Sequence, residues 1–172
     1  MRKRVPRISR APTSIARSRR RGVRAGRDLT VSDAPTWVLD TNVLVSGLLS
    51  PFGPPGRLVD LVESGRLRIA TDDRIEAEYR DVLARSRLGI DSSRREAFLA
   101  IVQFQEHVSA PPWMHAAPPD EDDTMFLEVA LRVPERTLVT GNVRHFPPRC
   151  RGPVTVCSPR AAWERFLRLK QP

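Results

Sequence analysis

Val38-Leu39-Asp40-Thr41-Asn42-Val43-Leu44 changes from a short apolar run into a helical pattern at a single acid, Asp40. A short apolar run bounded by a turn signal predicts a buried strand, and Asp before Thr and Asn is typical of a helix N-terminus. In an open parallel sheet, binding sites lie outside the carboxyl ends of the strands. Asp40 is therefore the first candidate functional residue.

The rest of the chain repeats this alternation of strand and helix. Further strands are predicted at 67–70, 137–139 and 154–156, with a short one beginning at Val108. Helices are predicted at 41–49 and 57–63 and from about 72, 92, 122 and 159 onward. Strands separated by helices imply an α/β fold, a three-layer sandwich with a central, mostly parallel sheet flanked by helices.

Two helices are expected to bury particular aromatic and aliphatic side chains. The helix that begins near Ser92 carries an apolar face that extends to Phe104. The last helix, opened by Pro159, is expected to turn Trp163, Phe166 and Leu167 inward.

The net charge of +9 is concentrated in one terminal segment. Residues 1–35 hold 11 Arg or Lys against Asp28 and Asp33, whereas residues 36–172 hold 18 basic and 18 acidic residues. With few large apolar side chains, residues 1–35 are predicted to be a disordered basic segment and 36–172 one folded domain. The basic segment could contact RNA, resemble an organellar transit peptide or have no function; it has no secretory signal.

The sequence gives no sign of a membrane or an oxidising compartment. No apolar run approaches the roughly 20 residues that a membrane-spanning helix needs. Cys150 and Cys157 have no second Cys or His pair at zinc-binding spacing, so reduced thiols are expected. We therefore expect a cytoplasmic protein.

Polar oxygens recur at the predicted element ends. Besides Asp40, they occur at Glu78, in the run Asp120-Glu121-Asp122-Asp123, and at Asn142 after the strand that ends in Thr140. Carboxylates gathered at strand ends suit a hard divalent cation, and such a site can hydrolyse phosphodiester bonds without a catalytic His or Cys. The pattern therefore favours metal-dependent cleavage of a nucleic acid.

Each of these positions also has a simpler interpretation. Asp40 could be only a helix N-cap, the acidic run at 120–123 only a solvated cap, Glu78 a surface residue and Asn142 a turn residue. The joint occurrence, each at an element edge, is the stronger signal.

The chain from Trp37 to about Phe166 resembles PIN domains, closest to the group of toxin components in bacterial toxin–antitoxin systems (VapC-like ribonucleases). The segments that carry the resemblance are Val38-Leu39-Asp40-Thr41-Asn42-Val43-Leu44-Val45-Ser46, Gly53-Pro54-Pro55-Gly56, Glu76-Ala77-Glu78-Tyr79-Arg80-Asp81-Val82-Leu83, Asp120-Glu121-Asp122-Asp123-Thr124-Met125-Phe126-Leu127-Glu128-Val129-Ala130 and Leu138-Val139-Thr140-Gly141-Asn142-Val143-Arg144-His145-Phe146.

The resemblance implies an Mg²⁺- or Mn²⁺-dependent endoribonuclease of a type II toxin–antitoxin pair, with Asp40, Glu78 and Asp123 as catalytic acids. The implied metal ligands are these three acids together with Asp122 and Asn142. Asn142 stands where many family members have an acid, which removes one negative charge. RNA is the implied substrate, and a cognate antitoxin and a homodimer are possible partners.

Three further residues are assigned supporting roles. Asn42 and Thr140 are expected to orient the carboxylates by hydrogen bonds. Arg144 is a candidate phosphate contact, because a guanidinium forks onto phosphate oxygens. His145 is interpreted as a loop residue in preference to a second phosphate contact.

Two alternatives compete with the nuclease. A dehalogenase-type phosphatase also begins with a strand-end Asp, but it wants a second Asp where Asn42 stands and a core Lys, and the only lysines are Lys3 and Lys170. A receiver-type phosphoacceptor fails on the same missing Lys. A catalytically weak or inactive RNA- or protein-binding module with the same fold stays open because of Asn142.

Overall fold

The computed structural model describes residues 34–169. The predicted disordered basic segment at 1–35 therefore lies outside the described residues, except for Ala34 and Pro35, which are both buried. The backbone N–H of Arg68 donates to the carbonyl of Pro35 at 2.9 Å, so this short lead-in already runs beside the sheet.

Five parallel strands form the central layer, in the order β3-β2-β1-β4-β5. The strands are β1 (Thr36–Leu39), β2 (Arg68–Thr71), β3 (Glu106–His107), β4 (Thr137–Val139) and β5 (Thr155–Cys157). The register pairs Val38 of β1 with Leu138 of β4, which sets the ends of these two central strands side by side. The predicted α/β architecture is confirmed, and every strand pairing is parallel.

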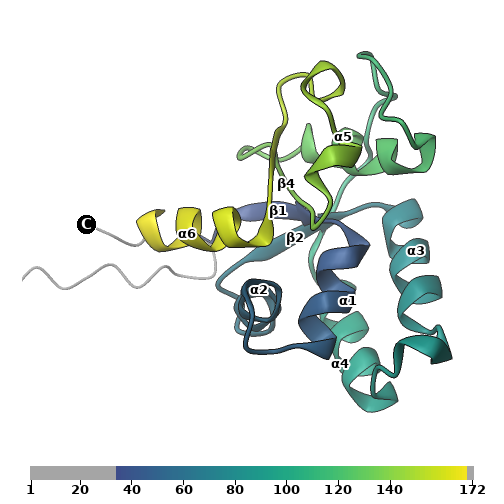
Figure 1. Cartoon of the computed structure of the whole chain (residues 1–172), viewed down its shortest axis with the longest axis vertical. Coiled ribbons are helices and arrows are strands. Elements are labelled where there is room, and N and C mark those ends of the chain that lie inside the picture. Colours follow the sequence, from purple (N-terminus) through teal and green to yellow (C-terminus); the bar gives the residue numbers. More distant parts are fainter. Residues whose placement is uncertain (1–33, 170–172) are drawn as a thin grey trace, which may run out of the picture.

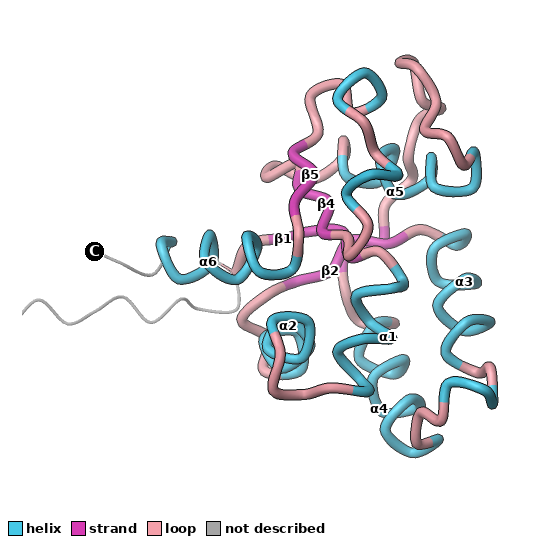
Figure 2. The backbone as a smooth tube through the Cα atoms, in the orientation of Figure 1, coloured by secondary structure: helices cyan, strands magenta, loops and turns pink. Residues whose placement is uncertain are grey.

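Helices cover both faces of this sheet (Figures 1 and 2). Helices α1, α2 and α4 lie below it in the view of Figure 1, with α3 at the right and α5 above the sheet. The helices are α1 (Thr41–Leu49), α2 (Pro54–Glu63), α3 (Asp73–Leu83), α4 (Ser92–Val102), α5 (Thr124–Ala130) and α6 (Pro159–Leu169). Short 3₁₀ turns occur at Ser86–Leu88, Glu121–Asp123, Val143–His145 and Pro148–Cys150.

The contact between α1 and α2 depends on a glycine. A Cβ at Gly47 would lie 2.6 Å from a methyl of Val59 and 2.8 Å from the carbonyl oxygen of Pro55, so only Gly lets the helices approach this closely. Pro54 and Pro55 open α2, where a missing N–H costs no hydrogen bond.

The core is apolar and extends from the sheet to the last helix. Trp37 is fully buried in β1, and its ring meets Phe166 of α6 edge to face with the ring centroids 6.4 Å apart. The guanidinium of Arg57 in α2 lies over the ring of Trp163 at 5.1 Å. These contacts fix α6 beside α2.

Two of the predicted core positions are wrong. Helix α4 ends at Val102, so Phe104 falls in the following turn and is 87% exposed. Leu167 is 43% exposed, because the buried side of α6 is centred on Ala162 and Phe166. In both places the apolar periodicity of the sequence includes a residue that the packed structure leaves exposed.

Element boundaries also differ from the prediction by small amounts. The short strand expected from Val108 lies instead at Glu106–His107, where Gln105 Oε1 accepts the Ile69 N–H at 3.1 Å. The run at 120–123 forms a 3₁₀ turn before α5, rather than the first turn of the helix itself.

Cys150 and Cys157 are free thiols, as expected. Among residues 34–169, no helix has the length and apolar character needed to cross a membrane.

Candidate active site

Asp40 lies at the carboxyl end of β1, almost completely buried at 7% exposure. Its N–H donates to the carbonyl of Val139 at 2.9 Å, which joins the ends of β1 and β4. Its Oδ1 accepts the Asn42 N–H at 3.1 Å, as expected of a helix N-cap. Its Oδ2 accepts hydrogen bonds from Asn42 Nδ2 at 2.7 Å and from the Thr140 hydroxyl at 2.6 Å.

Asn42 and Thr140 therefore contact Asp40 in the way predicted for orienting residues. The Thr140 hydroxyl also accepts the Asn142 N–H at 3.0 Å, and Asn42 Oδ1 accepts the Gly141 N–H at 2.8 Å. A Cβ at Gly141 would lie 2.8 Å from that same Asn42 oxygen, so a larger residue there would displace the Asn42 amide from this bond. The network fixes one rotamer of Asp40.

Glu78 reaches the same region from α3. The neighbouring Tyr79 is fully buried, and its hydroxyl donates to the carbonyl of Leu39, the last residue of β1. Glu78 itself accepts a hydrogen bond from the Thr41 hydroxyl in the first turn of α1. Burial raises the pKa of Tyr79 well above its ordinary value, so the phenol remains a neutral donor. These two bonds hold the middle of α3 against the end of β1.

Asp123 approaches from the opposite face of the sheet, at the junction between the 3₁₀ turn and α5. Its side chain is 18% exposed, and the buried Oδ2 accepts no hydrogen bond of good geometry. The imidazole of His145 lies close by, with its Nδ1 3.3 Å from that oxygen. A buried carboxylate oxygen with so little compensation is costly unless a cation joins it.

The remaining predicted residues lie around this centre. Asn142 is half-buried, and its side-chain amide contacts His145 Nε2. His145 therefore joins Asn142 to Asp123 instead of being an uninvolved loop residue. Asp122 is exposed, with its N–H donating to Asp120 Oδ1 at 3.1 Å. Arg144 is exposed in the 3₁₀ turn that follows Asn142.

The three predicted catalytic acids share one electrostatic field. Burial raises the pKa of Asp40 above its ordinary value. Burial also raises the pKa of Glu78, and the negative charges of Asp40 and Asp122 add to it against the Thr41 hydrogen bond. Burial raises the pKa of Asp123 to about 6, with further contributions from Asp40 and Asp120. Because burial and mutual repulsion disfavour the ionised forms of these carboxyl groups, a bound cation would stabilise them as anions.

These side chains do not form a closed cage. Within residues 34–169, no group of three or more His, Cys, Asp or Glu side chains is arranged to hold one metal ion. Mg²⁺, however, keeps several waters and is commonly held by only one or two carboxylates together with substrate phosphates. The orphaned oxygen of Asp123 and the charge coupling between Asp123 and Asp40 fit such an open site.

A cavity of about 380 Å³ begins at this acidic centre and runs between α1 and α3. Asp40 and Glu78 line one part of it, and Arg85 and Arg87 line another. Val45, Val82 and Leu88 are the apolar members of the lining. Neither arginine was singled out in the sequence.

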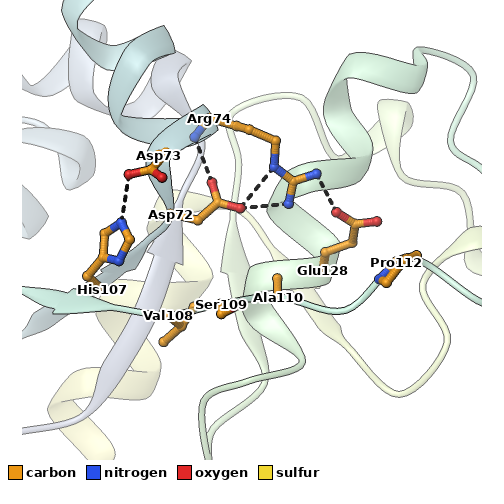
Figure 3. Close-up of a pocket in the computed structure, with 9 residues that line it drawn as sticks. All are labelled: Asp72, Asp73, Arg74, His107, Val108, Ser109, Ala110, Pro112 and Glu128. Carbon is orange, nitrogen blue, oxygen red and sulfur yellow. Dashed lines mark hydrogen bonds and ion pairs between the residues drawn. The ribbon is translucent and has the colours of Figure 1, made fainter.

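A second polar cluster lies where β2 and β3 end (Figure 3). Asp72 follows β2, and the Arg74 guanidinium lies between Asp72 and Glu128 of α5. A cavity of about 430 Å³ adjoins it. Because Arg74 neutralises both buried acids, this cluster joins α3 to α5.

Sequence reasoning missed two contacts of the acidic centre, the Thr41 hydroxyl on Glu78 and His145 on Asp123. Thr41 could have been found, because a hydroxyl in the first turn of a helix beside a strand-end acid faces the same edge. His145 gave no such signal, since its partner comes from a segment distant in the sequence.

Comparison with known proteins agrees with this geometry. A sequence profile described as the PIN domain matches residues 36–144, more than half of the chain. No curated protein and no solved structure matched the chain significantly. PIN domains are typically metal-dependent nucleases, and PIN nucleases bind RNA. With a strand-end aspartate, a central parallel sheet and this match, the chain belongs to the PIN domain family.

Proposed function

We propose that this protein is an endoribonuclease that hydrolyses RNA phosphodiester bonds with Mg²⁺ or Mn²⁺. Membership of the PIN family supports nuclease activity in general. The observation that carries the finer proposal is the Asp123 carboxylate. It combines a buried oxygen that His145 Nδ1 approaches at 3.3 Å without good hydrogen-bond geometry with a pKa raised to about 6 by burial and by nearby Asp40.

Asp40, Glu78 and Asp123 would hold the ion, with Asp122 and Asn142 at its margin. Thr140 and Asn42 keep the Asp40 carboxylate in one orientation, so little reorganisation is needed when the ion arrives. Bound there, the divalent ion would lower the pKa of a water molecule and neutralise charge on the phosphate oxygens. Arg144, exposed beside Asn142, is the proposed contact for a substrate phosphate.

We further propose that the protein is the toxin of a type II toxin–antitoxin pair that acts in the cytoplasm as a homodimer. The motif segments at 38–46 and 120–130, which resemble those of VapC-like ribonucleases, support this role. Expression of the chain in a bacterial host should arrest growth, and co-expression of a short neighbouring gene for the antitoxin should restore it. Normal growth under strong expression of soluble protein would count against a toxin.

A second candidate is a catalytically weak or inactive RNA- or protein-binding module. It is favoured by Asn142 in the position where an acid is common, and by the absence of a three-acid metal cage within residues 34–169. Such a module should bind RNA equally well with and without divalent ions.

The deciding experiment is an RNA cleavage assay on the purified full chain. We expect cleavage of single-stranded or structured RNA with Mg²⁺ or Mn²⁺ and none in excess chelator. Restoring the ion should restore cleavage, and isothermal titration should detect ion binding by the native protein. Activity that survives the chelator would contradict the proposal, and metal-independent binding without cleavage would favour the second candidate.

A further inference from the structure

The cavity beside the acidic centre is lined by acidic side chains at one end and by two arginines at the other, between α1 and α3. Glu78 and Val82 are one helical turn apart, so they share one stripe of α3 near its C-terminal end, and Arg85 follows shortly after the last residue of that helix, Leu83. Thr41 and Val45 form the facing stripe of α1. A nuclease that has only acids at its centre needs a separate cationic surface to hold a polyanion.

Arg87 is the free cation of this cavity. It is exposed in the 3₁₀ turn after α3, and it forms no ion pair within residues 34–169. Arg85 pairs with Asp81 at 2.6 Å, but this pair is exposed on the helix surface and stabilises the fold little. Both guanidinium groups can therefore turn to a phosphate at small cost.

The spacing separates the arginines from the reacting phosphate. From Glu78 the helix continues to Leu83, which is about 7.5 Å of helical rise, and Arg85 lies past that end of α3. The arginines therefore lie beyond the phosphate that the acids would bind, at the position of a neighbouring nucleotide. Val45, Val82 and Leu88 are all half-buried and offer an apolar wall to its ribose or base.

We propose that the cavity bounded by Glu78, Arg85 and Arg87 is a subsite for a single-stranded RNA nucleotide next to the scissile bond. Arg85 and Arg87 bind its phosphate, and the three apolar side chains contact its sugar or base. This inference rests on the proposed ribonuclease function, since it takes the acids as the site of cleavage. It adds a requirement for an unpaired flanking nucleotide.

The test measures binding of a short unstructured RNA to the full chain in chelator, by fluorescence anisotropy at several salt concentrations. For single strands the slope of log affinity against log salt is about 0.7 for each phosphate neutralised. We expect Arg87→Gln to reduce the slope by about 0.7 and to weaken binding several-fold, while Arg87→Lys keeps the slope. The basic segment at 1–35 is present in every variant and cancels in the difference.

Arg160→Gln is the matched control. Arg160 is an exposed arginine of α6, with an ion pair to Glu164 and no part in the cavity lining. Its loss should leave the RNA salt slope as in the unmodified protein. Thermal unfolding of Arg87→Gln checks that the variant is folded, and Arg85→Gln provides an independent second test of the same subsite.

The outcomes separate this inference from the function it rests on. If the unmodified protein cleaves RNA but Arg87→Gln and Arg85→Gln keep the full salt slope, the subsite is wrong and the nuclease stands. If the slope falls but the unmodified protein cleaves no RNA, the arginines bind a phosphate, the nuclease is wrong, and the assignment to a nucleotide beside a scissile bond is overturned with it. If Arg160→Gln reduces the slope as much as Arg87→Gln, the cavity has no special role and the inference is overturned.

Discussion

Asp40 and Asp72 occupy equivalent local positions in this fold. Each follows the last residue of a parallel strand, each caps the helix that comes next, and each is 7% exposed. They differ in what neutralises them. The Arg74 guanidinium binds Asp72 at 2.6 Å, whereas Asp40 has only hydroxyl and amide donors on its oxygens.

A similar difference separates Glu128 of α5 from Asp123, which directly precedes that helix. Glu128 accepts the Trp113 N–H at 2.6 Å and pairs with Arg74 at 2.6 Å, so its two oxygens are both compensated. Asp123, earlier in the chain, has a buried oxygen without a hydrogen bond. A strand-end aspartate cap is therefore a structural feature that the fold uses twice. Within residues 34–169, Asp72 is neutralised by an arginine, whereas Asp40 is not, and this is why Asp40 is the aspartate that suits a metal ion.

The largest expected effect is on the rate of RNA cleavage, and it comes from removing the negative charge of Asp40. Asp40→Asn should lower the rate of RNA cleavage by roughly 10² or more, because a charged ligand of the metal site is lost. Asp72→Asn, the matched control, should keep most of the activity of the protein that remains folded. Initial rates at saturating Mg²⁺ measure both. Equal loss in the two variants would mean that the two caps do the same structural job.

The next largest effect is on the free energy of unfolding, and it concerns the cluster of Arg74, Asp72 and Glu128. Arg74→Met leaves Asp72 and Glu128 buried without their cation, and we expect a loss of about 1–3 kcal/mol in unfolding free energy. The value is below that of a fully buried pair, because half of the Arg74 side chain is exposed. Urea unfolding monitored by circular dichroism gives the measurement.

Two controls bracket the Arg74 result. Arg74→Lys should recover part of the stability, since the charge remains but the fork onto two carboxylates is lost. Arg80→Gln breaks an exposed pair with Glu76 one helical turn away, and it should cost about 0.3–0.5 kcal/mol. If Arg74→Met costs no more than Arg80→Gln, the cluster does not join α3 to α5 in the way inferred.

These two aspartates also show how far sequence reasoning reaches. Local patterns locate strand, cap and helix at both positions, because the chemistry of a cap involves neighbours in the chain. They place Asp40, Thr140 and Asn142 at one sheet edge, since parallel strands end together. They do not reveal that Arg74 reaches Glu128, which lies in a distant helix, or that His145 lies against Asp123.

The wrong predictions have the same origin. Phe104 and Leu167 fit an apolar periodicity, but Phe104 lies past the end of α4 and Leu167 lies beside the buried face of α6. Arg85 and Arg87 appear in the sequence as ordinary surface charges, and only the packing of α3 against α1 places them in the cavity. Periodicity predicts a helix face, whereas the tertiary contact determines its extent.

A smaller effect concerns the pH dependence of stability without metal. Because the folded-state pKa of Asp123 is raised from 3.8 to about 6, the folded protein binds this proton more tightly than the unfolded chain. Unfolding free energy should therefore fall as the pH rises from about 4 to about 6, by about 1–2 kcal/mol after solvent screening. The decline should continue through about pH 6, where Asp123 is half ionised in the folded state, and level off about one pH unit higher.

Asp123→Asn tests the assignment of that slope. The variant removes the buried carboxyl charge and loses only the long His145 contact at Oδ2, so it should be more stable than the unmodified protein at pH 7 in chelator. It should also lack most of the slope between pH 4 and 6, measured by urea unfolding across this range. Asp40→Asn is a poor substitute, since its amide would face the donors that now bind Oδ2. A slope that persists in Asp123→Asn would assign it to other acids.

The smallest expected effect comes from adding a charge at the uncompensated centre. Asn142→Asp would place a further acid beside His145, which contacts Asp123, and divalent ion affinity should rise by about an order of magnitude, because affinity at oxygen sites grows with the number of charged ligands. Asn142→Ala is the control, since it loses the amide contact with His145 without adding charge. Titration calorimetry with Mg²⁺ and Mn²⁺ measures the affinities.

In chelator, Asn142→Asp should lower the free energy of unfolding, because another carboxylate joins a cluster of acids that no arginine or lysine in the described part of the chain neutralises. Tighter ion binding with no loss of metal-free stability would mean that the side chain at position 142 points away from Asp123. Asp40 and Asp123 would then be the only acids of this centre that differ from Asp72 and Glu128 in having no arginine partner among the residues that the structure describes.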